Sequence, residues 1–494
     1  SDSLWECTVE TTLRNDTFAA LDLAVTATLE NAAGKIIATA QTDARLERKA
    51  KLAANQTLAV ASPELWDTEH PNLYTVRVKV VSPAGEDECT ARTGFREVVF
   101  DPDKGLLLNG TPTKIKGVCC HGDYGLTGKA VPDNIQRYRV RLLREMGANG
   151  YRCAHYPQAE ATLDALDEHG FLVMAESRWF ESTKEGIEQL ETLIRRDRNH
   201  PSVIMWSLGN EEPLFTKPEG KRIFETLYAV AKRLDPSRPV MTAVDKSPTT
   251  APVFEIADLI GINYNLPAFD EVRRKYPDKC FISSENCAVP STRGFFFDSS
   301  PEKAAFNAMD CTVSNWQTSR EDTWKFLMQR DWIAGGYQWA GIEHRGETQW
   351  PRLCSQSGAL DLYLQRKDAF FQNQSHWSAG PMIHLLPHWN FRGREGEPIR
   401  VWAYTNCPEA ELFLNGVSLG RKTIDRFGHG EWWVPYTPGT LRAVGYLAGA
   451  EAAAESATTT GEPVALRLAL ENAGDLHANG RDLAVVTCFT VDAE

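Results

Sequence analysis

Two glutamates, Glu211 and Glu285, each follow a short apolar run and are the first candidates for chemistry. The run Ser202-Val-Ile-Met-Trp206 is too short for a helix and is bounded by Pro and Gly, which favours a buried strand that ends at Asn210-Glu211. A second run, residues 280–282, leads through two serines to Glu285. Catalytic groups gather at the carboxyl ends of parallel barrel strands, so two such glutamates can face each other across the mouth. Hydrolysis of a glycosidic bond requires such a pair, one as acid/base and one as nucleophile or second base.

Either glutamate alone could be an ordinary exposed residue, and the two can act as a pair only if strands and helices alternate along the chain. The predicted strands are 115–121, 150–155, 171–176, 203–208, 240–244, 259–264, 281–284 and 335–339. The predicted helices are 134–147, 160–169, 186–198, 221–234, 269–276, 321–330 and 367–377. Eight strands over about 280 residues indicate a (β/α)8 TIM barrel. On this count Glu211 ends the fourth strand and Glu285 the seventh.

The regions on either side of the predicted barrel alternate apolar and polar residues, which is typical of antiparallel sheets. Residues 1–99 are predicted to form an immunoglobulin-like β-sandwich, with Trp66 as a packing residue at its sheet edge. A second β-sandwich is expected over 379–461, where Asn415-Gly416 is a hairpin turn signal. Residues 462–494 offer three strands, too few for an independent sandwich. We therefore expect a multidomain α/β and all-β chain, with the barrel over 100–378 and an incomplete further β-sandwich at 462–494.

Composition narrows the class of protein. The chain has 494 residues and a net charge of -13, which argues against a nucleic-acid binder. No apolar run is long enough for a membrane span, and residues 1–20 do not have the pattern of a signal peptide. The eleven cysteines lack CxxC spacing and are expected to be reduced. The compartment stays open: the bacterial cytoplasm, or the periplasm or exterior if the sequence is part of a longer one.

Several motifs give the chain a family resemblance. The most specific are Gly105-Leu-Leu-Leu-Asn-Gly110, Lys116-Gly-Val-Cys-Cys-His121, Arg152-Cys-Ala-His155-Tyr-Pro157, the stretch from Arg196 to Glu211, and Gly336-Tyr-Gln-Trp339. With them the chain resembles glycoside hydrolase family 2, the family of β-galactosidases, β-glucuronidases and β-mannosidases. The match is close between residues 94 and 377. The flanking sandwiches match in order and character.

The resemblance implies roles for eight residues. Glu211 would be the acid/base and Glu285 the nucleophile of a retaining double displacement, and Asn210 would bind the sugar 2-hydroxyl. The other expected substrate-binding residues lie at the ends of other strands: His121, Arg152, His155, Tyr264 and Trp339. Tyr264 would hydrogen-bond the nucleophile, and Trp339 would offer an aromatic face to the sugar. As alternatives, Arg152 could pair with a barrel carboxylate, and the histidines and Trp339 could be core residues.

The chain also departs from the family pattern. The jelly-roll sugar-binding domain that usually precedes the first sandwich is not present in the sequence. Ala175-Glu176 stands where many members have Asp-Glu, which argues against a magnesium site near Glu176 and Glu211, so no cofactor is expected to be required. Asn286-Cys287 replaces an aromatic residue and Gly after the nucleophile. The Asn-x-Lys-Gly element of β-glucuronidases is not found, which favours the β-galactosidase type, but His344-Arg345 could meet an acidic sugar and keeps glucuronidase as the alternative.

Two readings from other classes also remain. The barrel could have lost catalysis and serve as a carbohydrate-binding protein, although both glutamates and Asn210 are retained. A metal-dependent hydrolase could use His121, His155 and Glu176, but a close ligand motif such as HExxH is missing. The expected partner is a carbohydrate substrate, and a homo-oligomer is compatible with the sequence.

Overall fold

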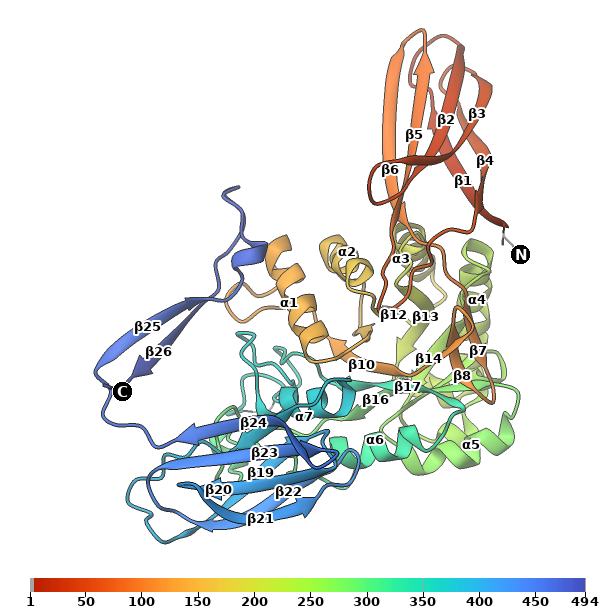
Figure 1. Ribbon diagram of the computed structural model, residues 1–494. Helices are drawn as coiled ribbons and strands as arrows, with labels where there is room; N and C mark the ends of the chain where they lie inside the picture. The colour runs from red at the N-terminus through yellow and green to blue at the C-terminus, as the bar shows by residue number, and fades with distance from the viewer. Residues whose placement is uncertain (1–3, 349, 494) are drawn as a thin grey trace.

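The computed structural model describes residues 4–348 and 350–493. At its centre eight parallel strands form a closed barrel in the order β10 to β17 (Figure 1). The strands are β10 (Ile115–Cys120), β11 (Gly150–Cys153), β12 (Leu172–Ser177), β13 (Val203–Asn210), β14 (Val240–Val244), β15 (Leu259–Asn263), β16 (Cys280–Cys287) and β17 (Ile333–Trp339). The predicted TIM barrel is confirmed. Its strands are nearly continuous apolar runs because both of their faces are buried.

Helices cover the outside of the barrel and match the predicted periodic segments. They are α1 (Asp133–Glu145), α2 (Glu160–Glu168), α3 (Lys184–Asp197), α4 (Pro218–Leu234), α5 (Phe269–Lys275), α6 (Arg320–Met328) and α7 (Asp368–Trp377). The hydroxyl of Thr183 caps α3 by accepting from the Gly186 N–H. Between β14 and β15 the described chain has only the 3-10 turns η2 (Pro248–Thr250) and η3 (Pro252–Glu255), where two prolines four residues apart disfavour a regular helix.

One barrel strand is longer than predicted, and this changes the setting of Glu285. The predicted strand stopped at Ser284, but β16 continues to Cys287, so Glu285 lies within the strand. The ladder continues because Asn263 of β15 pairs with Glu285, and Gln338 and Trp339 of β17 pair with the two residues after it. The polar residues that suggested a strand end are therefore held on both sides by parallel neighbours.

The N-terminal region is an antiparallel sandwich that stands out from the barrel (Figure 1). One sheet pairs β1 (Leu4–Arg14) with β4 (Lys51–Ala61), and the other has the order β3 (Ile36–Leu46), β2 (Leu21–Glu30), β5 (Tyr74–Ser82), β6 (Gly85–Thr93). A small sheet of β7 (Val98–Asp101), β8 (Gly105–Leu108) and β9 (Thr111–Thr113) leads into the barrel. Trp66 is a packing residue, as predicted, but the prediction that it lies at the edge of the sandwich sheet was wrong. It is fully buried in a cluster with barrel residues, and its indole N–H donates to the Asp167 carbonyl at 2.9 Å.

The alternating pattern after the barrel also forms antiparallel sheets. One contains β18 (Ile383–Leu386), β19 (Pro398–Thr405) and β22 (His429–Pro435), and the other β21 (Val417–Thr423), β20 (Glu409–Leu414), β23 (Thr440–Leu447) and β24 (Ala450–Thr458). Asn415 and Gly416 both have positive φ and form the predicted hairpin turn. Finally β25 (Ala465–Leu470) and β26 (Val486–Val491) pair as a separate ribbon (Figure 1). Among the described residues no helix is long and apolar enough to cross a membrane.

Candidate active site

A cavity of about 850 Å³ opens where the barrel strands end, and it gathers most of the predicted site residues. Six of them line it: His155, Asn210, Glu211, Tyr264, Glu285 and Trp339. The other two, His121 and Arg152, lie behind this lining and contact residues that belong to it. The barrel therefore brings together side chains from strand ends that are far apart in the sequence.

Glu211 is aimed by a turn with unusual backbone geometry directly after β13. Gly209 has a φ of 94° and Glu211 a φ of 54°, and the Glu211 N–H donates to the Ala243 carbonyl at 2.9 Å. A positive φ is costly for a residue with a side chain and persists only where the surrounding structure enforces it. The Asn263 side-chain amide donates to Glu211 Oε1 at 2.7 Å. Burial and the nearby negative charge of Glu285 raise the pKa of Glu211 to about 7.

Glu285 has a different environment on β16. Its Oε1 accepts from the Arg152 guanidinium at 2.6 Å, and its Oε2 accepts from the Tyr264 hydroxyl at 2.7 Å. Burial and the charge of Glu285 raise the pKa of Tyr264 well above its usual value. This phenol therefore stays protonated and donates a hydrogen bond to Glu285. Two hydrogen bonds thus fix the orientation of the Glu285 carboxylate.

Arg152, from β11, is the cation beneath the mouth. It is fully buried and donates to Glu176 and to Asn210 Oδ1, each at 2.7 Å, as well as to Glu285. Burial alone would lower the pKa of Arg152, but the charges of Glu176 and Glu285 raise it well above its usual value. One permanent positive charge therefore ties three strands together and supports an anion at Glu285.

The surroundings of Glu176, on β12, test whether this site fits a metal. Its carboxylate accepts from Arg152, from Ser207 at 2.9 Å, and pairs with His155 Nδ1 at 2.7 Å. Burial would raise the pKa of Glu176, but Arg152 and His155 hold it below its usual value. Both carboxylate oxygens face hydrogen-bond donors, which does not fit a divalent cation that needs free oxygen ligands. In the described parts of the chain, His121, His155 and Glu176 do not form a group with metal-ligand spacing.

Aromatic and imidazole rings form one wall of the mouth. His155 stacks on Trp339 with 5.2 Å between ring centroids, and His121 stacks on the buried His344 at 3.9 Å. Burial and the neighbouring His344 and His155 lower the pKa of His121 to about 2. His121 is therefore neutral and packs behind the wall, while His155 and Trp339 face the cavity.

Asn210, the last residue of β13, presents one end of its amide to the cavity. Its Oδ1 accepts from Arg152 and from Asn263 at 3.0 Å, which fixes the orientation of the amide. Within the described chain its Nδ2 has no acceptor. This leaves an N–H group of Asn210 available to a ligand in the cavity.

The structure adds cavity residues that sequence reasoning missed: Asp245, Asn263, Trp316, Glu347 and Arg352. Asn263 could have been found, because it is a polar residue that directly follows an apolar run, one position before the end of the predicted strand 259–264. His344 and Arg345, which were expected to meet an acidic sugar, do not line the cavity: His344 is buried, and the Arg345 guanidinium donates to the Gly125 carbonyl. The glucuronidase alternative therefore does not depend on these two residues. Among the described residues, Arg352 is the one arginine that lines the cavity.

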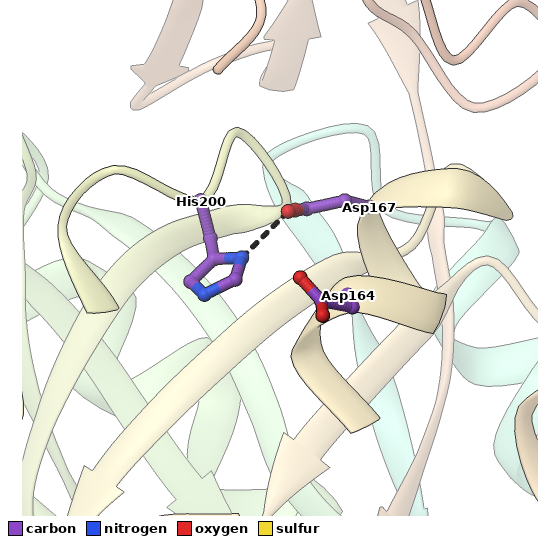
Figure 2. Close-up of side chains that lie close together, drawn as sticks. All are labelled: Asp164, Asp167 and His200. Carbon is purple, nitrogen blue, oxygen red and sulfur yellow. Dashed lines mark hydrogen bonds and ion pairs between the residues drawn. The ribbon is translucent and has the colours of Figure 1, made fainter. Parts of the chain in front are cut away.

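The opposite end of the barrel, where the strands begin, has a second cluster of ionisable groups (Figure 2). His200 Nδ1 lies 2.6 Å from Asp167 Oδ2, and Asp164 lies beside them. Within the described residues this is the one group with the spacing of metal ligands. Asp164 already pairs with Arg92 at 2.5 Å, and Asp167 also accepts from the Ser202 N–H at 3.0 Å. Protein donors thus satisfy these acids, and we treat the cluster as structural.

Comparison with known proteins places this geometry in a family. A model described as "Glycosyl hydrolases family 2" matches residues 1–96, and one described as "Glycosyl hydrolases family 2, TIM barrel domain" matches residues 101–183 and 180–285. A domain of unknown function matches residues 396–453.

Individual relatives cover between 81% and 99% of the chain. It is 33% identical to the beta-galactosidase BoGH2A of Bacteroides ovatus over 98% of this chain and 64% of that protein. It is 30% identical to a beta-glucuronidase of Bacteroides fragilis over 81% of this chain and 61% of that protein. A crystal structure of a glycosyl hydrolase family 2 member from Bacteroides cellulosilyticus superposes with a TM-score of 0.85 at 29% identity, covering 99% of this chain and 66% of that one. The chain thus spans less than two thirds of the length of these curated relatives.

Proposed function

The chain belongs to glycosyl hydrolase family 2, and from that premise we propose that it is a retaining glycosidase that removes terminal β-linked sugars, with β-D-galactosides as its substrates. The observation that carries this proposal is the contrast between two glutamates of one cavity. Glu211 has a pKa of about 7, while Glu285 accepts hydrogen bonds from Arg152 and Tyr264. An acid that is still protonated near neutral pH beside an oriented carboxylate is the requirement for double displacement.

In the first step, the proton of Glu211 goes to the glycosidic oxygen as the bond from that oxygen to the anomeric carbon breaks. The carboxylate of Glu285 attacks the same carbon and forms a glycosyl ester with the enzyme. Arg152 and Tyr264 hold this carboxylate in place. The leaving group departs as an alcohol, so no free alkoxide forms.

In the second step, Glu211 is a carboxylate and takes a proton from water. The oxygen of that water attacks the anomeric carbon, and the bond to Glu285 breaks, which releases the sugar with its original configuration. The free N–H of Asn210 donates to the 2-hydroxyl, and this contact strengthens in the transition state. Trp339 and His155 offer ring surface to the C–H groups of the sugar.

Glu347 supports galactosides over glucuronides. It lines the cavity, and its pKa stays below the usual value because contacts with His344 and Trp339 outweigh its burial. A negative carboxylate accepts hydrogen bonds from sugar hydroxyls and repels a sugar carboxylate. Glucuronidase remains the second candidate, because Arg352 lines the same cavity and curated relatives carry both names.

The test is hydrolysis of nitrophenyl β-glycosides of galactose, glucuronic acid, mannose, glucose and fucose, with Glu285→Gln as control. We expect the largest kcat/KM for the galactoside and a loss of about 10⁴-fold in the variant, because no nucleophile remains. A faster glucuronide would replace galactosidase with the second candidate. Binding of the sugar without turnover, in a protein as long as the curated relatives, would instead favour a carbohydrate-binding function.

A further inference from the structure

Trp316 is an exposed indole in the cavity that the two chemical steps do not use. Its side chain is 53% exposed, yet it lines the same cavity as Glu211 and Glu285. Its ring meets the ring of Tyr264 edge-on, with 5.0 Å between centroids and an angle of 87°. Since Tyr264 donates to Glu285, the indole lies one side chain away from the nucleophile.

The loop that carries Trp316 is anchored by its own side chains. The Gln317 amide donates to the Ala288 carbonyl at 2.7 Å, just beyond β16. Its Oε1 accepts from the N–H and from the hydroxyl of Ser314 at 2.9 and 3.0 Å. Ser314 and Gln317, which flank Trp316, are thus tied to Ala288, the residue directly after the strand that carries Glu285. The loop anchor and the edge-on contact with Tyr264 restrict the exposed indole, so less side-chain entropy is lost when it binds a ligand.

Trp316 lies nearer to the solvent than Trp339, which belongs to the aromatic wall of the cavity. Trp339 is only 4% exposed and lies deep in the cavity with Glu211 and Glu285, between which the proposed mechanism places the sugar that is cleaved off. Trp316 marks the rim. The side-chain amides of Asn265 and Asn315 line the same cavity and make no hydrogen bond to any described residue. An exposed aromatic ring with free amide groups beside it can bind a sugar ring, because the aromatic ring stacks on the C–H face and the amides hydrogen-bond the hydroxyls.

We propose that Trp316 is the stacking platform of a leaving-group subsite at the rim of the cavity, which takes a pyranose or an aryl ring. Asn265 and Asn315 hydrogen-bond the hydroxyls of a pyranose there. The proposal rests on the function proposed above, because the leaving group is defined by the bond that Glu211 protonates. It makes Trp316 a determinant of which aglycone is accepted.

The test compares three substrates of the preferred sugar: a disaccharide, a nitrophenyl glycoside and a glycosyl fluoride, whose leaving group is a single atom. For Trp316→Ala we expect kcat/KM to fall about tenfold with the first two and to change less than about twofold with the fluoride, because only the stacked ring is lost. Trp316→Phe should recover part of the loss. Trp179→Ala is the matched control: Trp179 is 54% exposed but does not line the cavity.

An equal loss with the fluoride would overturn the proposal, because Trp316 would then act on Tyr264 and Glu285 instead of on the leaving group. An equal loss in Trp179→Ala would overturn it as well. Binding separates this result from a failure of the proposed function. In Glu285→Gln, which cannot turn over, calorimetry should show tighter binding of the disaccharide than of the monosaccharide, and adding Trp316→Ala should remove the difference. Equal affinities with Trp316 present would contradict the platform even if the protein hydrolyses nothing.

Discussion

The two ends of the barrel contain the same kinds of ionisable side chain in opposite settings. At the floor, where the strands begin, each acid has protein donors of its own. Asp167 accepts from His200 and Ser202, and Asp164 pairs with Arg92. Asp167 is fully buried, and this cluster does not line the large cavity.

At the mouth, only one of the two glutamates has its negative charge balanced by a cationic side chain. Glu285 is bonded to Arg152 and Tyr264, whereas among the described side chains Glu211 has only the neutral amide of Asn263 as a donor, and it faces the cavity. Burial and the charge of Glu285 therefore raise the pKa of Glu211 to about 7. The difference indicates that an acid paired away from the cavity, such as Asp167, stabilises the fold, whereas an acid beside the cavity without a cationic partner is available for proton transfer.

The largest expected effect follows from the under-compensated acid. Glu211→Gln should lower kcat/KM about 10³-fold for substrates with poor leaving groups, and less for nitrophenyl glycosides, whose leaving group needs little protonation. In the wild type, kcat/KM should fall as the pH rises through about 7, because Glu211 then loses the proton that it must donate. The measurement is a pH profile of both proteins with two leaving groups.

The neighbouring Glu212 is the control for this prediction. It pairs with Arg178 at 3.0 Å and does not line the cavity, so Glu212→Gln should keep both the rate and the basic limb of the profile. A similar loss of kcat/KM in Glu212→Gln would mean that any change in this turn lowers the rate. Glu211 could then not be assigned the role of acid.

At the floor, removing an acid should change the stability of the protein and not its activity. Asp167→Ala leaves the Ser202 N–H and His200 without their acceptor inside the protein, so we expect a loss of about 3 kcal/mol in the free energy of unfolding. The kcat/KM of the folded variant should stay unchanged. Denaturant unfolding and steady-state kinetics on the same sample measure both. Asp164→Ala, at a partly exposed position, should cost only about 1 kcal/mol; a selective loss of kcat/KM in Asp167→Ala would contradict a purely structural floor.

The sequence predicts the barrel, and the position of the two glutamates at its mouth, because both depend on local patterns. Apolar runs bounded by Gly and Pro mark the strands, and a polar residue directly after such a run marks the mouth. Asn263 follows the same pattern. The error at β16 arose because a strand that continues on polar residues depends on its neighbours, and no local pattern contains that information.

The residues that shape the cavity rim could not be predicted in this way. Trp316, Glu347 and Arg352 belong to the connections 288–319 and 340–367, which have no helical or strand period. The position of Trp316, for example, depends on a contact between residues far apart in the sequence, the bond from Gln317 to Ala288. Long irregular loops tend to carry function, and here they carry the residues on which sugar and aglycone choice depend in our proposals.

The smallest expected effect is a change in the free energy of unfolding that has opposite signs at the two ends of the barrel. The pKa of Glu211 is about 7 in the folded protein, compared with 4.5 for an unperturbed glutamate. The folded state therefore holds this proton more tightly than the unfolded state, and the wild type loses stability as the pH rises from about 4.5 to about 7. A shift of this size corresponds to at most ~3 kcal/mol, and because the carboxyl faces the solvent of the cavity we expect about 2 kcal/mol.

Glu211→Gln cannot ionise, so the variant should lack this loss. It should be about 2 kcal/mol more stable than the wild type at pH 8 and nearly equal to it at pH 4.5. Denaturant unfolding at the two pH values measures the difference. Because Asp167→Ala is expected to destabilise, removing an acid should raise stability at the mouth and lower it at the floor. If Glu211→Gln were less stable than the wild type at pH 8, the mouth would be as well compensated as the floor, and the physical reason for assigning Glu211 the role of acid would disappear.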